Sequence, residues 1–470
     1  MVKEKLIAIL GEKNVSDLET DKIAYSRDCF PLKIMQYKEG NMEPLPDYIL
    51  WPENAQQISE ILKIANENKI PVIPYGGGGG VNGGVIPITG GILLDVQKLD
   101  KVIEINEESL FVTAQAGILG QHLEDVLNQR GYTYGHLPSS LQCSTLGGFA
   151  ANRSAGALSS KYGKIEDMVF DLEVVLPNGD IIHTNPTKTP RSATGPDLTQ
   201  FFLGSEGCLG VITEITLKIH PVPDIRKFIG FLFNDLHSGL EAVKKIFRTS
   251  IRPSIVRLYD DVEARMVYHI SDIQKGQSYL TLAFDGYENT KVLMEKEYQI
   301  CYDICKNQGG KDMGEEGGKI WFQNRLNMYY PNRQYHNANV LADTIDVATT
   351  FDNIENLYYK MKEAIKRKKI NVMAHWSHFY PNGGSMYMIF VMIEKNKDHR
   401  AERLYEEAWR DGLDASVANG GTMSHHHGVG IFKGDWMSKQ LGPAFELLKN
   451  LKKTIDPNNI MNPGKLGFPK

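Results

Sequence analysis

The sequence predicts an α+β fold with more than one domain, and three observations support this expectation. The chain has 470 residues, more than the roughly 250–300 at which a single hydrophobic core stops growing. Hydrophobic residues make up 42% and charged residues 23%, so the chain is too apolar to be disordered. Helical and strand-like periodicities alternate along the chain, and no internal repeat is present.

The first predicted domain covers residues 1–222. Its N-terminal stretch Met1–Leu18 reads as an amphipathic helix, and Asn54–Lys69 places apolar residues on one helical face. Val72–Tyr75 is a short apolar run bounded by turn residues, as expected for a strand. The domain ends at His220-Pro221-Val222-Pro223, because proline cannot continue a strand ladder.

Residues 223–427 form the second predicted domain, in which long helical stretches alternate with strand-like runs such as Met386–Ile393. The last segment, residues 428–470, contains one predicted helix, Ser438–Lys453, and has no core of its own. We therefore expect it to pack back on the rest of the chain.

The charge balance and the cysteine content exclude several classes of protein. Lys and Arg number 52 against 57 Asp and Glu, a net charge of −5 that provides no basic footprint for nucleic acid. No run of about 18 apolar residues exists, so no integral membrane segment is expected. Five scattered cysteines, an odd number, favour a reducing cytoplasm over a disulfide framework. The N-terminus lacks the pattern of a secretion signal.

The most informative feature is a glycine cluster that follows Val72–Tyr75. Nine glycines lie between Gly76 and Gly91, and the first five are consecutive. Consecutive glycines allow positive φ and let successive N–H groups point into one concavity, which binds anions such as pyrophosphate. No helix opens directly on this loop and no Gly-Lys-Ser/Thr ends it, so neither a Rossmann site nor a P-loop fits. A phosphate cradle of another kind is our interpretation.

Two further stretches combine glycines with small and hydroxyl-bearing residues. The first runs from Pro138 to Gly148 and continues into Asn152–Gly156, and the second is Gly204–Ile212. Such residues suit close hydrogen bonding to a polar cofactor. Three stretches in this order indicate a cofactor site more specifically than one glycine loop does.

These stretches resemble the FAD-binding domain of the vanillyl-alcohol oxidase / p-cresol methylhydroxylase (PCMH) superfamily, and the resemblance extends to the ending Asp456–Lys465. It implies two α+β subdomains that wrap an extended FAD, an α+β cap domain over the isoalloxazine, and a C-terminal tail that returns to the FAD domain. The residues that it implies bind the cofactor are Pro74, Tyr75, Gly76, Gly77, Gly78, Gly79, Gly80, Val81, Asn82, His136, Pro138, Ser139, Ser140, Ser144, Thr145, Gly148, Asn152, Ser154, Ala155, Glu206, Gly207, Gly210, Val211 and Ile212.

One branch of this superfamily, the D-lactate/glycolate dehydrogenases, usually carries a Glu-His-Gly motif and a second His pair that helps to bind a metal. In this sequence Ser424-His425-His426-His427-Gly428 replaces the first motif. A stretch that begins at His378 replaces the pair, with no second histidine at the required spacing. No metal is therefore expected.

The triple histidine is similar instead to the alkyldihydroxyacetonephosphate synthase branch, as is the segment Arg252–Leu258. This likeness implies catalytic roles for Tyr387, His425, His426 and His427. The arginine that should face the substrate falls on Asn332. The residues expected to bind the substrate are therefore its neighbours and two pocket candidates: Arg325, Arg333, His378 and Tyr380.

These residue types suit acid–base chemistry beside a flavin. A histidine near neutrality can take the proton of a hydroxyl or a carbon acid, and a nearby phenol can relay it. On a strand, His425 and His427 would share a face while His426 points away, so at most two of the three would contact the substrate. Arg325 could clamp a carboxylate with its planar fork, or form a salt bridge within the cap.

Three functions fit these observations. The leading hypothesis is an FAD-dependent oxidoreductase that oxidises a hydroxyl-bearing carbon of a small 2-hydroxy acid or related alcohol and passes electrons to an unidentified acceptor. The alternative is a transferase like alkyldihydroxyacetonephosphate synthase, which uses FAD without net redox. A non-catalytic FAD-binding module is disfavoured by Tyr387 and the histidines. The only expected partner is a small-molecule substrate, although a homodimer would be unsurprising.

Overall fold

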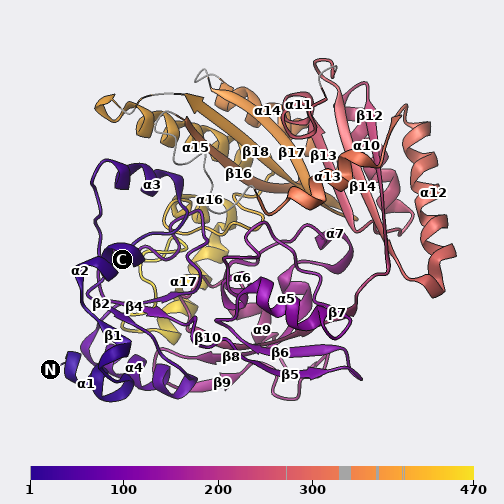
Figure 1. The fold of residues 1–470 in the computed structure, drawn as a ribbon. Helices are drawn as coiled ribbons and strands as arrows, with labels where there is room; N and C mark the ends of the chain where they lie inside the picture. The colour runs from indigo at the N-terminus through magenta and orange to yellow at the C-terminus, as the bar shows by residue number, and fades with distance from the viewer. Residues whose placement is uncertain (1, 271–272, 328–339, 367–369, 394, 396) are drawn as a thin grey trace.

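In the computed structural model, two small sheets and their helices lie below a larger sheet (Figure 1). The structure describes residues 2–270, 273–327, 340–366, 370–393, 395 and 397–470. Helices and strands are mixed in both parts, which confirms the α+β prediction. Within these described ranges, no helix is both long and apolar enough to cross a lipid bilayer.

The first sheet holds the strand from which the glycine cluster departs. Its strands are ordered β1-β2-β4-β3, and β4 runs parallel to both β2 and β3. Helix α4 supplies the crossover from β2 to β3 that parallel strands need, whereas the glycine cluster connects β3 to β4. The elements are α1 (Val2–Leu10), η1 (Glu12–Asn14), β1 (Val15–Ser16), α2 (Glu19–Tyr25), α3 (Pro31–Lys38), β2 (Tyr48–Leu50), α4 (Ala55–Asn68), β3 (Val72–Tyr75) and β4 (Ile92–Asp95).

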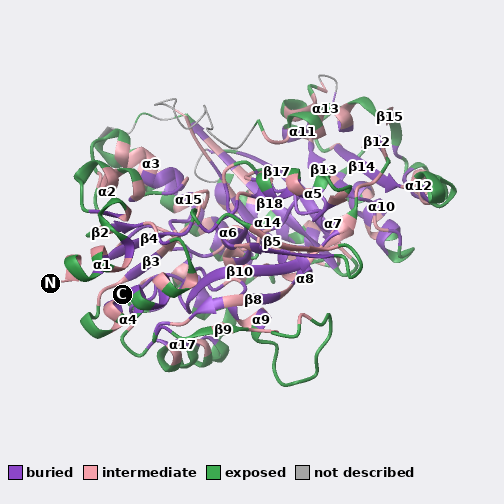
Figure 2. Cartoon of the chain, turned by 60° about the horizontal axis from the view of Figure 1, so that its bottom comes forward, coloured by how far each residue is buried: buried purple, intermediate pink, exposed green. Residues whose placement is uncertain are grey.

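The second sheet is antiparallel, with the order β5-β6-β10-β8-β9. The other two cofactor-like stretches lie mainly in loops between the elements of this part of the chain. The elements are β5 (Val102–Asn106), β6 (Phe111–Gln115), α5 (Gly120–Asn128), α6 (Leu146–Asn152), α7 (Ser159–Tyr162), α8 (Ile165–Met168), β8 (Val169–Val175), β9 (Ile181–His183), α9 (Leu198–Phe202) and β10 (Val211–Lys218). Figure 2 shows that the loop between β9 and α9 is exposed, while β10 is buried along most of its length.

The cap sheet is also antiparallel and has the order β15-β12-β14-β13-β17-β18-β16. A two-stranded ribbon pairs β7 (Tyr132–Thr133) with β11 (His220–Pro221), and β11 directly precedes the cap sheet in the chain. The strands are β12 (Ile225–Phe233), β13 (Ile255–Asp260), β14 (Ser278–Gly286), β15 (Lys311–Gly314), β16 (Val340–Thr350), β17 (Asn371–Tyr380) and β18 (Gly383–Ile393). The helices are α10 (Leu236–Arg248), α11 (Asp261–Tyr268), η2 (Glu288–Thr290), α12 (Lys291–Asn307), α13 (Glu316–Asn324), α14 (Ile354–Lys366), η4 (Lys397–His399) and α15 (Arg400–Ala418).

Alternation along β18 gives the cap sheet two different faces. Met386, Met388 and Phe390 point into a large core cluster with residues of α10, α14 and α15. The residues between them, Tyr387 and Ile389, therefore point to the opposite face, because successive side chains of a strand alternate. That second face is the one on which the functional site lies.

The C-terminal segment packs back on the first sheet. Val72 N–H donates to the Ile460 carbonyl at 2.7 Å, and Asn462 N–H donates to the Val72 carbonyl at 2.9 Å. The single predicted helix over 438–453 is wrong: the chain forms η5 (Gly434–Trp436), α16 (Met437–Leu441) and α17 (Pro443–Ile455). Gly442, with a φ of 54°, separates the last two, because proline at the next position starts a new helix.

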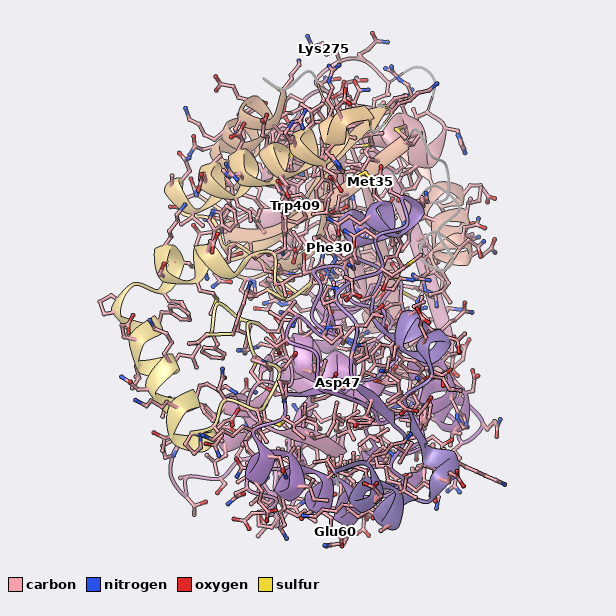
Figure 3. The ribbon with its side chains drawn as sticks, turned by 90° about the vertical axis from the view of Figure 1, so that its left-hand side faces the viewer. Phe30, Met35, Asp47, Glu60, Lys275 and Trp409 are labelled. Atoms are coloured by element: carbon pink, nitrogen blue, oxygen red, sulfur yellow. The ribbon has the colours of Figure 1, made fainter. Side chains whose placement is uncertain are left out.

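The N-terminal segment is also more broken than predicted and reaches the cap. The expected helix Met1–Leu18 ends at Leu10, where Gly11 takes a φ of 78°. Further along, α3 contacts β16 of the cap sheet. Figure 3 shows Phe30, at the start of α3, near Trp409 of α15, and both belong to the same core cluster. The cap is therefore joined to the N-terminal half of the chain through packed side chains.

Candidate active site

A large cavity lies where the three cofactor-like stretches meet the cap sheet. Its volume is about 1180 Å³, above the roughly 300–1,000 Å³ usual for a pocket that holds one small ligand. All the residues implied to bind the cofactor line it, with the exception of His136. Other lining residues come from the cap and the loop that follows it, among them Arg257, Tyr259, Glu263, Trp321, Arg325, His375, His378, Tyr387, His426 and His427.

The glycine loop approaches residues 143–145 so closely that side chains would not fit between them. A Cβ on Gly77 would lie 1.8 Å from the Cys143 carbonyl oxygen, and one on Gly76 would lie 2.3 Å from Thr145 Oγ1. Gly78 has a φ of 62°, a conformation that favours glycine. These positions leave backbone at the cavity wall, as a phosphate cradle requires.

His136 lies behind the cavity wall and not on it. Its side chain is fully buried, and its Nε2 is 2.7 Å from Ser154 Oγ, which belongs to a lining residue. Burial lowers the pKa of His136 to about 3, so the ring is neutral near pH 7. His136 can therefore act on a bound cofactor only through Ser154.

Two predicted cofactor residues also hold the loop that follows the triple histidine. The Glu206 carboxylate accepts the N–H groups of Val429 at 2.6 Å and Gly430 at 2.8 Å. Asn82 Nδ2 donates to the carbonyls of His427 at 2.9 Å and Gly428 at 3.0 Å. The cofactor side of the cavity is thus bonded directly to the histidine-bearing loop.

One buried carboxylate, Asp346 on β16, holds the histidines themselves. Its Oδ2 accepts the backbone N–H groups of His425–His427 at 2.9, 2.8 and 3.0 Å, and Ser424 Oγ at 3.0 Å. Its Oδ1 lies 2.7 Å from Lys433 Nζ, and both side chains are fully buried. Burial alone would raise the pKa of Asp346, but His427 and Lys433 outweigh it and hold the pKa well below its usual value.

Tyr387 contacts two of the three histidines. Its Oη makes a hydrogen-bond contact with His426 Nε2 and lies 3.4 Å from His427 Nε2, whereas His425 Nε2 is 2.9 Å from Tyr380 Oη. The expectation that His425 and His427 share a face is therefore wrong, because the run bends around one carboxylate and forms no strand. Burial raises the pKa of Tyr387 and lowers that of His426. Both are neutral near pH 7 and can share a proton.

Strand register sets further residues in one row across the cap sheet. Asp346 is paired with Tyr387, Tyr387 with His375, and His375 with Tyr259. The rings of His375 and Tyr387 stack with their centres 4.6 Å apart and an angle of 16°. His375 Nδ1 is 2.7 Å from Glu263 Oε1, which fixes the orientation of that ring against the tyrosine.

A β-bulge in β17 brings His378 to the same cavity. The register shifts between His375 and His378, and both line the cavity although they are three residues apart. In a regular strand such residues would point to opposite faces. The His378 ring stacks on His425 at 5.5 Å, and its Nδ1 has no hydrogen-bond partner in the part of the chain that the structure describes. Tyr380, predicted to bind substrate, does not line the cavity.

Two arginines line the cap end of the cavity, and neither pairs with a carboxylate of the described residues. Arg257 donates from Nε to Tyr259 Oη at 2.6 Å, and its guanidinium lies 4.5 Å from the Trp321 ring centre. Arg325 lies 4.0 Å from the Phe322 ring centre, and its buried Nε has no hydrogen-bond partner among the described residues. Burial lowers the pKa of Arg325 to about 10. Unpaired guanidinium groups in a cavity are suited to bind an anion.

Two expectations remain, the substrate residue Arg333 and the absence of a metal. Arg333, predicted to bind substrate, lies outside the described residues. Within the described ranges, the one group of three side chains close enough to hold a metal is Glu39, His399 and Glu402. None of these three lines the cavity.

The residues that the sequence analysis missed are mostly charged groups inside the cap. Arg257 and Glu263 line the cavity, while Asp346 and Lys433 lie behind the histidines. A weak signal existed for Arg257, since a charged residue inside the apolar run Ile255–Leu258 points to a buried role. Nothing in the sequence near Lys433 indicated its pairing with a residue on β16.

One wall of the cavity is a backbone cradle with hydroxyl groups, and the other is a cluster of histidines, a tyrosine and arginines. This arrangement is typical of a cofactor-dependent enzyme. Residues 46–185 match the family described as "FAD binding domain", and residues 222–466 match "FAD linked oxidases, C-terminal domain". The chain belongs to the FAD-linked oxidase family, and its cofactor is FAD.

The relatives of known name include both oxidases and synthases. The glycolate oxidase subunit GlcD of Bacillus subtilis is 30% identical over 99% of this chain and 96% of its own length. The alkyldihydroxyacetonephosphate synthase of Dictyostelium discoideum is 29% identical over 96% of this chain and 78% of its own length.

Solved structures agree with this assignment of the fold. A structure of alkyldihydroxyacetonephosphate synthase superposes with a TM-score of 0.83 and 26% identity, and covers 99% of this chain and 86% of that one. The structure of p-cresol methylhydroxylase superposes with a TM-score of 0.80 and 19% identity over 100% of this chain and 96% of the other. The predicted membership of the vanillyl-alcohol oxidase / PCMH superfamily and the PCMH-type fold are confirmed.

Proposed function

We propose that the protein oxidises the hydroxyl-bearing carbon of a small 2-hydroxy acid or a related alcohol. The observation that carries this proposal is Arg257, a cation that lines the same cavity as Tyr387 and has no carboxylate partner among the described residues. Arg257 is close enough to Tyr387 to oppose the rise in pKa that burial causes there. An acid group bound at Arg257 would bring its neighbouring hydroxyl toward that phenol.

The cavity fits FAD on two observations. Any side chain at Gly76 or Gly77 would fill the cradle, and the buried Asn82 Oδ1 has no protein partner in the described ranges. We infer that Pro74–Asn82 hold the pyrophosphate, and that Pro138–Thr145, Asn152–Ala155 and Glu206–Ile212 hold the rest of the cofactor. When bound, FAD supplies the acceptor for the hydride that leaves the substrate carbon.

The protein's own part in the reaction is to bind the acid and remove a proton. Tyr387 and His426, in hydrogen-bond contact, take the hydroxyl proton as the carbon loses its hydride, which leaves a 2-oxo acid. Because His426 is buried and its pKa lowered, it is unprotonated and can accept that proton at neutral pH. His427 Nε2 lies 3.4 Å from the same phenol oxygen and would help to orient it.

Three further residues complete the substrate side of the proposal. Arg325, whose buried Nε has no partner in the part of the chain that the structure describes, is a second cation that can bind an acid group. His378 exposes its ring to the cavity and would hydrogen-bond the substrate. Tyr380 would act indirectly, since it contacts His425 and does not line the cavity.

A second candidate function is a transferase like alkyldihydroxyacetonephosphate synthase, in which FAD undergoes no net redox change. The His425–His427 run favours it, as do the relatives of that name. The coverage of relatives favours the oxidase instead: the match spans 96% of the glycolate oxidase subunit but 78% of the synthase.

Anaerobic mixing of the FAD-loaded protein with a panel of substrates separates the two. Loss of the oxidised-flavin absorbance with a 2-hydroxy acid, followed by a 2-oxo acid as product, supports the oxidase. An absorbance change with acyl-dihydroxyacetone phosphate alone, and none with any hydroxy acid or alcohol, would replace this proposal by the transferase.

We further propose that the enzyme works in the cytoplasm, since all five cysteines are unpaired.

A further inference from the structure

Lys433 and Asp346 form a buried ion pair directly behind the three histidines. The ammonium lies 2.7 Å from Asp346 Oδ1 and 3.1 Å from Ser424 Oγ, and neither charged side chain is exposed to solvent. The Lys433 ammonium also lies 5.4 Å from the centre of the Trp409 ring. No charge of this pair faces the cavity, because neither residue lines it.

The pair is also next to the imidazole rings. Asp346 Oδ1, the oxygen that accepts from Lys433, is 3.3 Å from His427 Nδ1, and Asp346 Oδ2 is 3.8 Å from His426 Nδ1. A negative charge at this distance strongly favours the protonated form of a histidine. The lysine cancels that charge.

We propose that Lys433 and Asp346 are positioning residues: Asp346 holds the backbone of His425–His427, and Lys433 offsets the negative charge that Asp346 places beside the rings of His426 and His427. Asp346 supplies the geometry, since one oxygen binds three successive backbone N–H groups. Lys433 supplies the compensating charge. The catalytic consequence rests on the proposed function, because only unprotonated imidazoles can accept the substrate proton.

Other charged or titratable groups face the same histidines and stay unchanged in the test. They are Tyr387, Tyr380 and His378 from β17 and β18, Asp343 from β16, and Lys164, whose Nζ donates to the His425 carbonyl at 2.9 Å. Any shift that follows a change at Lys433 or Asp346 is therefore measured against a constant background.

The test is a titration of isotope-labelled histidine side chains by NMR in Lys433→Met, in Asp346→Asn and in the double variant. Asparagine keeps one oxygen to accept the backbone N–H groups. In Lys433→Met the bare carboxylate should raise the titration midpoint of His427 by about 1 pH unit or more. In Asp346→Asn the bare ammonium should lower it, and the double variant should return it close to that of the wild type. The His427 signal is identified by its loss in His427→Gln.

A purely structural role predicts a different result. Both single variants would then move the midpoints in the same direction or leave them unmoved, and the double variant would be the most disturbed; that pattern would overturn the proposal. Lys452→Met is the matched control, since it breaks another buried Lys–Asp pair, with Asp456, away from the histidines. If Lys433→Met does not fold, an unshifted His427 in Asp346→Asn overturns the proposal equally.

The pH dependence of kcat/KM provides the catalytic readout. In Lys433→Met the acid limb of the profile should move to higher pH with the histidine midpoint. The NMR titration needs no substrate, so the two proposals can fail separately. A wild-type protein that oxidises no hydroxy acid but shows opposite shifts in the two variants would contradict only the proposed function.

Discussion

The two walls of the cavity are built in different ways. The cofactor wall is backbone: Gly76, Gly77 and Gly79 lie against residues 143–145, with no room for a Cβ at Gly77. The catalytic wall is side chains: Tyr387, His375 and Tyr259 stand in one row across three strands, and Asp346 ends the row behind the histidines. The cofactor wall depends on the lack of side chains in short segments of sequence. The catalytic wall depends on pairing between strands that are far apart in the sequence.

This difference indicates how each wall should respond to mutation. Backbone contact tolerates almost no added volume, so the cofactor wall should fail as a whole when one glycine is changed. The catalytic wall is a set of hydrogen bonds and charges that can be removed one at a time while the sheet remains folded. Single substitutions there should change rates or affinities and leave FAD in place.

The largest effect is expected at Gly77. In Gly77→Ala the new Cβ would lie 1.8 Å from the Cys143 carbonyl oxygen, a backbone atom that no rotamer change can move aside. We expect loss of bound FAD and a lower stability by about 1–3 kcal/mol or more, measured as the flavin-to-protein absorbance ratio and by thermal unfolding. Gly84→Ala is the control, because its nearest atom would be Glu206 Oε2 at 3.8 Å. Full flavin content in Gly77→Ala would show that the cradle is not where we place it.

On the catalytic wall, Tyr387→Phe should have the largest effect. Loss of the hydroxyl that contacts His426 should reduce turnover by about 10²–10⁴-fold while the flavin content stays at the wild-type value. Tyr380→Phe is its matched control: it removes a phenol that contacts His425 outside the cavity, so we expect a far smaller loss. Equal losses of turnover in the two variants would mean that Tyr387 is not the catalytic tyrosine that its place in the cavity suggests.

Arg257→Met should weaken substrate binding and spare the chemistry. Loss of a hydrogen bond to a charged group costs up to about 3 kcal/mol, so KM for a 2-hydroxy acid should rise by about 10²-fold. An alcohol without an acid group should be oxidised with an unchanged KM. If KM rises equally for both kinds of substrate, Arg257 does not bind the acid group. Arg325→Met would then be tested in the same assay.

The smallest effect concerns His136, which supports the cofactor wall through Ser154. Its pKa is lowered to about 3 by burial, against about 6.5 in an unfolded chain. The unfolded state therefore binds a proton that the folded state does not, and stability falls as pH drops below about 6.5. In His136→Gln the free energy of unfolding should depend less on pH, by up to about 1.4 kcal/mol per pH unit between about pH 6 and pH 4. Urea unfolding at several pH values measures this slope. If the slope in His136→Gln equals that of the wild type, His136 binds a proton as readily in the folded as in the unfolded state.

Much of the cofactor wall could be predicted from the sequence, because its information is local. Gly76–Gly80 directly follow a strand, and the stretches Pro138–Gly148 and Gly204–Ile212 carry their own small and hydroxyl residues. The residues named from these three stretches line one cavity. His136 is the exception, since its sequence position beside Pro138 could not reveal that Ser154 stands between it and the cavity.

The catalytic wall was less accessible, because it depends on strand register and charge pairing. Tyr387 and the histidines were named by resemblance, but their mutual geometry was not: the histidines bend around Asp346 instead of alternating on a strand. Lys433 bonds Asp346 across 87 residues of sequence. His378 reaches the cavity only through a β-bulge in β17. No periodicity along a single segment carries that information.

The most direct test of the proposed oxidation compares a 2-hydroxy acid with its counterpart deuterated at the hydroxyl-bearing carbon. The FAD-loaded protein is mixed with each under anaerobic conditions, and the rate of flavin bleaching is recorded. If that carbon loses a hydride in the step that reduces the flavin, bleaching should slow several-fold with the deuterated acid and a 2-oxo acid should form. Bleaching by neither acid, or bleaching without formation of a 2-oxo acid, would contradict the account.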